Sequence, residues 1–208
     1  LMVLGFILRF YGWGRDLGAQ DEQIILLGYV YKDIKYIVTT YFPSMSHHIF
    51  HSVLLRIMVV LFGEDNAWAI RFPAFISGIA CLWLIYKIAV EIFKNIFSAQ
   101  LALLIAALNQ VHIYYSHTAR GYSLSLFLTT LMLYATLQTL KPNHSKFWAF
   151  ILPSSGFLLV YTIPTNVYFL LGLGLWVFLI FHIPSIMRGF NLNKKQQTTS
   201  KNHYLLVI

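Results

Sequence analysis

Residues 69–93 read AIRFPAFISGIACLWLIYKIAVEIF, and the length of this apolar run indicates the fold class. As a helix it would reach about 37 Å at about 1.5 Å per residue, which exceeds the roughly 30 Å of hydrocarbon in a bilayer. The chain of 208 residues is 58% apolar and only 11% charged, with a mean hydropathy of +0.67. Water-soluble domains carry about 25% charged residues. The sequence therefore predicts a polytopic integral membrane protein.

Further apolar runs lie on both sides of this stretch. Together they predict six spans, at 1–10, 69–93, 97–115, 121–141, 146–162 and 166–187, with a seventh beginning near 204. Because the chain begins and ends inside apolar runs, we expect residues 1–208 to be the N-terminal part of one transmembrane domain. The expected fold class is all-α, a polytopic transmembrane helix bundle. Its long first extracytoplasmic loop, residues 11–68, is expected to carry membrane-surface helices.

Residues 49–62 are also apolar, but they are too few to cross a membrane comfortably. As a helix they would measure about 21 Å. His48, Ser52 and Arg56 recur every fourth residue and would share one face, whereas apolar residues occupy another. A short helix with a polar stripe is typical of the membrane surface. We therefore predict an interfacial helix at 49–62.

The charged residues indicate a membrane topology. The formal net charge is +8, but the Lys and Arg residues do not cluster on one polar face, so nucleic acid is not an expected partner. With 49–62 left out of the spans, eight of the fifteen basic residues fall on one side with a single acid. Six of the seven acids fall in 11–68 on the other side. Since short cytoplasmic loops collect Lys and Arg, we expect 11–68 and the 116–120 loop to share the extracytoplasmic face.

Three groups of polar residues near that face are candidate sites, because ionisable residues at membrane depth are costly and usually functional. The first is Asp21-Glu22, directly before the apolar residues 24–30. A carboxylate there can act as a general base or hold a divalent cation. Alternatively, Asp21 caps the helix that follows, and spacing alone favours this second interpretation.

The second group is Ser46-His47-His48-Ile49-Phe50-His51. His47 and His51 are four residues apart and would share a helical face, as paired metal ligands do. No third ligand is evident, so binding phosphate or positioning an acceptor is favoured over a metal site. Hydrogen bonding by amphipathic interfacial side chains is the structural alternative.

The third group runs from Tyr114 to Tyr122 and contains Arg120 where one predicted span ends and the next begins. A guanidinium there offers a forked set of donors that suits phosphate. Snorkelling to lipid headgroups beside a tyrosine belt explains the same position equally well.

The order of these motifs resembles the integral-membrane glycosyltransferases of the GT-C type, and most closely the bacterial group related to protein mannosyltransferases and aminoarabinose transferases. The resemblance covers residues 1 to about 140. It rests on Arg9-Phe10-Tyr11, Asp21-Glu22, Ser46-His47-His48-Ile49, Leu61-Phe62-Gly63-Glu64, Ala69-Ile70-Arg71-Phe72-Pro73, Tyr114-Tyr115-Ser116 and Ala119-Arg120-Gly121-Tyr122-Ser123-Leu124.

This resemblance implies roles for individual residues. The family's acidic motif falls on Asp21 and Glu22, which become the catalytic candidates, with Asp21 as the base or acceptor-orienting group. The implied substrate-binding residues, near the donor phosphate or the acceptor, are His47, His48, His51, Arg120 and Tyr122.

The resemblance also implies a reaction. A sugar would pass from a polyprenyl-phosphate donor to an acceptor at the extracytoplasmic face, with inversion of configuration. The acceptor is an unknown lipid, protein or glycan. Some relatives carry a second acid in the loop corresponding to 116–120, which here has none, so no metal ligand or cofactor is assigned and a divalent cation stays an open alternative.

Two other functions are compatible with the sequence: a membrane transporter or flippase, and a non-catalytic membrane subunit that packs against partners. Transporters often have repeated halves with broken helices, and the chain has Pro153 and Pro164 interruptions but no visible repeat. The expected location is the inner or plasma membrane of a bacterium, with membrane lipids as neighbours.

Overall fold

The computed structural model describes residues 1–14, 17, 20–40, 47–143 and 145–182, which form helices and turns without any strand. The all-α prediction is confirmed. The named elements are α1(Met2–Phe10), α2(Gln20–Ile25), η1(Leu26–Val30), α3(Ile34–Thr39), α4(Ile49–Phe62), α5(Ala67–Phe93), α6(Ile96–Leu108), α7(Gln110–Ser116), α8(Tyr122–Thr139), α9(Lys146–Thr162) and η3(Pro164–Asn166). Residues 1–166 form one compact unit, and residues 167–182 of the second unit are helical.

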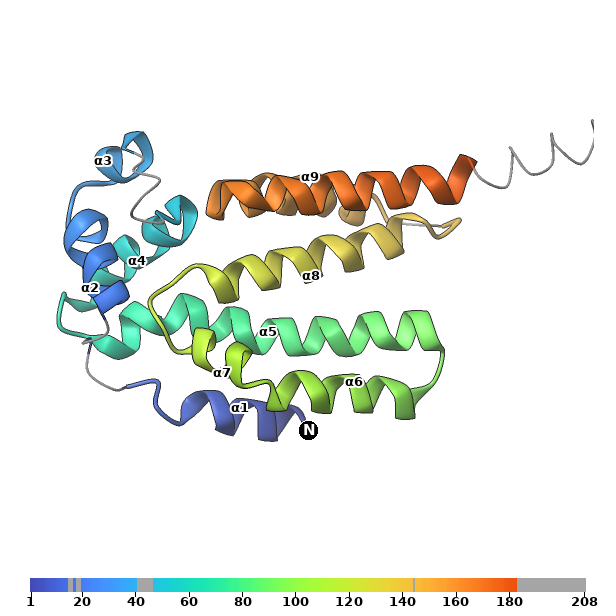
Figure 1. Cartoon of the computed structure of the whole chain (residues 1–208), viewed down its shortest axis with the longest axis horizontal. Helices are drawn as coiled ribbons and strands as arrows, with labels where there is room; N and C mark the ends of the chain where they lie inside the picture. Colours follow the sequence, from blue (N-terminus) through green and yellow to red (C-terminus); the bar gives the residue numbers. More distant parts are fainter. Residues whose placement is uncertain (15–16, 18–19, 41–46, 144, 183–208) are drawn as a thin grey trace, which may run out of the picture. The chain divides into compact units, whose positions relative to one another are not determined.

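Helix α5 is the centre of the first unit (Figure 1). It contacts α1, α4, α6, α7 and α8, and α9 packs against α8. The approach of α7 requires glycine at position 78, because a Cβ there would lie 2.2 Å from the Ser116 Oγ atom. Beside this contact, the Ser123 hydroxyl donates to the Ala74 carbonyl at 2.9 Å and joins α8 to α5.

Two helices are long and apolar enough to cross a membrane, namely α5 and Pro164–His182. The bent pair α6 and α7 makes a third candidate if it counts as one span. These helices support an integral membrane protein. The six-span assignment and the 11–68 loop boundary remain predictions, and the expected onset near 204 lies outside the described residues.

The run predicted as one span at 97–115 is divided into α6 and α7, with a bend of 62° between them. Asn109 begins the second part, because its side chain accepts a hydrogen bond from the His112 backbone N–H at 2.9 Å. The buried Arg9 guanidinium donates to the carbonyls of Ala106 and Ala107, each at 3.2 Å. These donors satisfy carbonyls that the end of α6 leaves without helical partners, so the break has a defined physical cause.

The helix predicted at 49–62 is α4, with the same bounds. Its buried face combines His51 and Ser52 with Leu55 and Val59. The exposed side is apolar at its C-terminal end, where Val60, Leu61 and Phe62 are 58–66% exposed. Part of the polar stripe therefore faces protein, and an apolar end is left for a membrane surface. The location of α4 at the interface remains a prediction.

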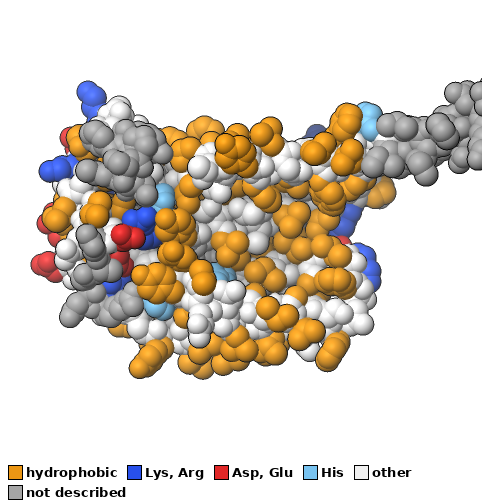
Figure 2. Space-filling model, viewed as in Figure 1, with side chains coloured by type: hydrophobic (Ala, Val, Ile, Leu, Met, Phe, Trp, Pro, Cys, Tyr) orange, Lys and Arg blue, Asp and Glu red, His pale blue; other side chains and the backbone are white. Residues whose placement is uncertain are grey.

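Helices α2, α3 and α4 gather at the end of the bundle where α5 begins (Figure 1). A hydrophobic cluster lies beneath them: Ile25, Leu26, Tyr29, Val30, Ile37, Leu55, Val59, Ile70 and Ala119. Burial of these side chains fixes the short helices against the bundle. Figure 2 shows Asp and Glu side chains collected at this same end, whereas hydrophobic side chains cover the length of the bundle.

Candidate active site

The two acidic residues of the first candidate group differ in exposure to solvent. Helix α2 begins at Gln20, so Asp21 and Glu22 lie in its first turn, and Asp21 is not the residue that precedes the helix as a cap would be. The Asp21 side chain is 72% exposed, whereas that of Glu22 is 1% exposed. One acid is thus available to ligands, and the other is available only to protein groups.

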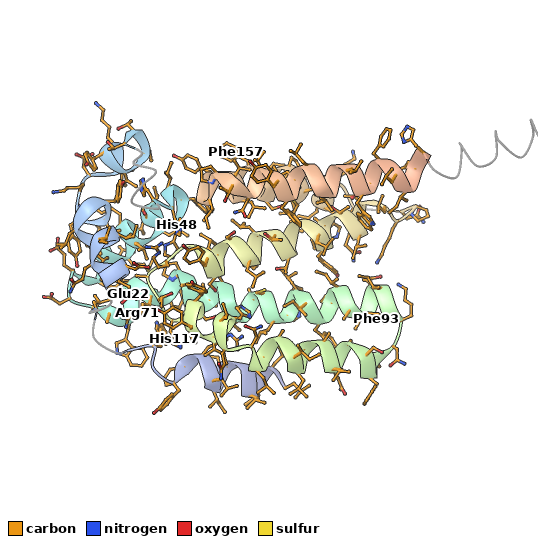
Figure 3. All side chains as sticks on the ribbon, in the orientation of Figure 1. Glu22, His48, Arg71, Phe93, His117 and Phe157 are labelled. Atoms are coloured by element: carbon orange, nitrogen blue, oxygen red, sulfur yellow. The ribbon has the colours of Figure 1, made fainter. Side chains whose placement is uncertain are left out.

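Glu22 forms a buried ion pair with Arg71 of α5. The Arg71 Nε atom lies 2.9 Å from Glu22 Oε1, and Nη2 lies 2.7 Å from Oε2. Arg71 Nη1 also donates to the Trp13 carbonyl at 3.0 Å. Figure 3 shows Glu22 and Arg71 together near the start of α5. Two parallel hydrogen bonds make this pair rigid as well as strong, so it fixes α2 on α5.

A tight turn, residues 118–121, carries Arg120 between α7 and α8. Its Arg120 N–H donates to the Thr118 carbonyl at 2.8 Å. The N–H of Ala119 donates to Glu22 Oε1 at 2.7 Å, and the N–H of Gly121 donates to His48 Nδ1 at 2.9 Å. Side chains from two distant segments therefore hold the residues on both sides of Arg120.

Gly121 is required at its position because a Cβ there would lie 2.9 Å from His48 side-chain atoms. His48 also meets the ring of Tyr122 edge to face, with centroids 4.8 Å apart. Burial, together with the nearby positive charges of Arg120 and His47, lowers the pKa of His48 to about 3, and burial is the largest of these causes. The imidazole is consequently neutral at physiological pH and can accept the Gly121 hydrogen bond.

The Arg120 guanidinium faces Asp21. Its Nη1 atom lies 3.7 Å from Asp21 Oδ2, and its side chain is 8% exposed. Nη2 donates to the Tyr122 hydroxyl at 3.1 Å, and the guanidinium carbon lies 5.3 Å from the centre of the Tyr122 ring. Within the described residues, the buried Nε atom has no hydrogen-bond partner. The 3.7 Å separation is too long for a hydrogen bond, so the guanidinium keeps donors for an anionic ligand.

The other two histidines contribute differently. His47 precedes α4, so it does not share a helical face with His51, and the expectation of a shared face is wrong. Its Nδ1 atom lies 3.1 Å from the Thr40 carbonyl, and its ring stacks on Tyr29 with centroids 3.6 Å apart. Among the described residues there is no group of three or more His, Cys, Asp or Glu side chains that could hold a metal ion.

His51 lies inside α4 and is fully buried. Neither ring nitrogen has a hydrogen-bond partner within the part of the chain described here, and the adjacent Ser52 hydroxyl has none either. Burial lowers the pKa of His51 to about 3, with smaller contributions of the same sign from His48 and Arg120. His51 thus adds a neutral polar ring beneath the site.

Arg71 is not among the site residues predicted from the sequence. The signal was present, because an arginine inside the apolar run 69–93 is costly unless a buried partner compensates its charge. Its partner, however, lies 49 residues earlier in the chain. Such a pairing has no local sequence pattern, and only the packing of α2 on α5 reveals it.

Comparison with known families identifies the chain. Residues 46–190 match the family described as dolichyl-phosphate-mannose-protein mannosyltransferase. The chain belongs to this family. The match covers more than half of the sequence and includes His47, His48, His51, Arg71 and the 118–121 turn, whereas Asp21 and Glu22 precede it. Curated proteins and solved structures gave no significant match.

Membership in the mannosyltransferase family agrees with the resemblance found in the sequence. It implies glycosyl transfer from a lipid-linked sugar phosphate by an integral membrane protein. The transferase interpretation is thereby favoured over a transporter or a packing subunit.

Proposed function

We propose that this protein is an inverting glycosyltransferase that uses a polyprenyl-phosphate sugar at the extracytoplasmic face of a bacterial membrane. Asp21 is the general base or acceptor-orienting group, and Arg120 with Tyr122 binds the donor phosphate. The observation that supports this proposal most directly is the placement of an exposed carboxylate 3.7 Å from a largely buried guanidinium, although the two residues are 99 positions apart in the sequence.

The two groups have the complementary properties that the reaction needs. Asp21 is accessible to an acceptor hydroxyl, and Arg120 offers forked donors in a partly dry setting, where fixed positive charge stabilises a developing anion best. The Asp21 carboxylate takes the acceptor proton while the acceptor oxygen forms a bond to the anomeric carbon. The bond from that carbon to the phosphate oxygen breaks, and polyprenyl phosphate leaves with the electron pair, beside Arg120.

The charge distribution supports the proposed side of the membrane. Asp21, Glu22, Asp33, Glu64 and Asp65 all belong to the segment that covers the start of α5. At the other end of α5, Glu91 is bound by Lys94 and Lys141. An end rich in lysine is typical of the cytoplasmic side, so the site is assigned to the opposite face.

A transfer assay with labelled polyprenyl-phosphate sugars tests the proposal on the full-length protein in lipid nanodiscs. We expect Asp21→Asn to lose at least 100-fold in kcat, by the order of magnitude that general base catalysis contributes, and to keep donor binding. Asp65→Asn is the matched control, because it removes another exposed carboxylate from the same segment. Equal transfer by Asp21→Asn and wild type, or no transfer by the wild type with any donor of this class, would overturn the proposal.

A further inference from the structure

The turn that carries Arg120 is held from both sides by buried side chains. Ala119 is fully buried, Glu22 is 1% exposed and His48 is 4% exposed, so water does not compete for the two hydrogen bonds. The partners lie 97 and 73 residues away from the turn along the chain. Such bonds, made by buried N–H groups to distant side chains, fix a turn more strongly than its own local hydrogen bond does.

The acceptors themselves are fixed. Glu22 is held by the two-pronged contact with Arg71, which is anchored in turn on the Trp13 carbonyl. His48 is the residue directly before α4, and its ring lies against Gly121 and Tyr122. Each acceptor therefore ties the backbone beside Arg120 to a packed helix. Glu22 holds the Ala119 side, and His48 holds the Gly121 side.

We infer that Glu22 and His48 are positioning residues, which clamp the backbone N–H groups of Ala119 and Gly121 so that the Arg120 guanidinium faces Asp21. This role differs from direct catalysis by Glu22 and from direct substrate contact by His48. The clamp rests on hydrogen bonds within the chain. Its consequence for the reaction rests on the proposed function of Arg120.

Conservative substitutions at position 48 can separate the need for a hydrogen-bond acceptor from the need to fill space. Gly121 needs an acceptor at the position of His48 Nδ1, and the side-chain oxygen of asparagine occupies the same place relative to Cβ. His48→Asn therefore preserves the acceptor, whereas His48→Leu fills the space without one. His182→Leu, at an exposed histidine on the helix after η3, is the matched control.

Glu22 needs a different design, because removing it alone leaves the buried Arg71 charge without a partner. The double variants Glu22→Gln/Arg71→Met and Glu22→Leu/Arg71→Met both remove the ion pair. They differ in whether an oxygen remains for the Ala119 N–H. Comparison of these two variants isolates the hydrogen bond from the charge pair.

The first measurement is hydrogen–deuterium exchange of peptides covering residues 117–124 in full-length protein in nanodiscs. We expect His48→Leu and Glu22→Leu/Arg71→Met to accelerate exchange in these peptides at least 10-fold. His48→Asn and Glu22→Gln/Arg71→Met should restore slow exchange relative to their partners. Unchanged exchange in His48→Leu, or equal exchange in the Asn and Leu variants, would overturn the clamp whether or not the protein transfers sugar.

The second measurement is steady-state transfer. A misplacement of about 1 Å can cost about 100-fold in rate, so we expect His48→Leu to lower kcat 10- to 100-fold and His48→Asn to recover most of that loss. The loss should appear in kcat more than in the KM for the acceptor, because a positioning role gives His48 no direct contact with the acceptor. Faster exchange in His48→Leu without any fall in kcat would overturn the positioning role. A wild type with slow exchange and no transfer would contradict the proposed function alone.

Discussion

Glu22 and Arg71 meet through two hydrogen bonds, of 2.9 and 2.7 Å, at a point where both side chains are almost completely buried. The pair joins α2 to the N-terminal part of the central helix α5. Because the same Glu22 carboxylate accepts the Ala119 N–H, this one contact also reaches the turn that carries Arg120.

Breaking this pair on one side should destabilise the protein strongly. We expect Arg71→Met to lower the free energy of unfolding by about 3–5 kcal/mol, because it leaves a buried carboxylate without its counter-charge. The double variant Glu22→Gln/Arg71→Met should be less harmful than the single one, since it leaves no unpaired charge. Thermal melting in detergent checks both. Arg56→Met is the control, because Arg56 is half-buried and, among the described residues, its guanidinium makes only a long hydrogen bond of 3.4 Å to the Val30 carbonyl.

The forked geometry of Arg120 should matter beyond its charge. We expect Arg120→Lys to weaken binding of polyprenyl phosphate about 10-fold or more, because an ammonium group cannot offer the planar pair of donors that a phosphate accepts. Asp21→Asn should bind the same lipid at least as tightly as the wild type, since it removes a negative charge near the phosphate. Equilibrium binding of the lipid in nanodiscs measures both variants. Equal affinities for Arg120→Lys and the wild type would contradict the assignment of Arg120.

The protein should become less stable in mild acid. Burial lowers the pKa of His47 to about 4 and those of His48 and His51 to about 3, whereas an unfolded histidine titrates near 6.5. As the pH falls below 6.5, these histidines therefore bind protons in the unfolded state but stay neutral in the native state. The contribution of these histidines to the free energy of unfolding is fully present above about pH 6.5. It is lost as the pH falls toward 4, by up to about 1.4 kcal/mol per pH unit for each histidine.

Melting temperatures measured between pH 7.5 and 4.5 test this expectation. His51→Leu should flatten the acid dependence, because it removes one of the three groups. It should cost little at pH 7.5, since neither ring nitrogen of His51 has a hydrogen-bond partner in the described part of the chain. An acid dependence equal to that of the wild type would show that His51 does not titrate as its burial predicts.

The close contact of α5 and α7 should have room for a side chain at Gly78 or at Ser116 but not at both. Gly78→Ala places a Cβ 2.2 Å from Ser116 Oγ and 2.7 Å from Ser116 Cβ, so we expect it to cost about 1–3 kcal/mol by overpacking. The double variant Gly78→Ala/Ser116→Gly removes both of these atoms and should recover part of the loss. Gly172→Ala is the control, because within the described residues of its own unit an added Cβ there meets no atom closer than 4 Å. Melting curves of the three variants decide whether the contact is as tight as described.

The amino-acid sequence was enough to predict the helical membrane class, the bounds of the helix at 49–62 and the family. Apolar length alone predicts a membrane helix, because hydrocarbon requires every backbone group to be paired within its own segment. The helix at 49–62 has the predicted bounds, and that prediction rests on an apolar run too short to cross a membrane with a polar residue at every fourth position. The sequence also predicts Asp21, Glu22 and Arg120 as candidate site residues, because ionisable residues at membrane depth are costly and usually functional.

Which charged side chains meet became visible only once the helices were packed together. Asp21 and Glu22 are neighbours in the sequence, yet one is exposed beside Arg120 and the other is buried on Arg71. The break at Asn109, supported by Arg9 from another helix, was also not predicted, because the polar pair Asn109-Gln110 lies within a run long and apolar enough to be one span. Apolar periodicity reports which face of a helix is buried, but the partner across the interface depends on how distant helices pack, and that information is not local.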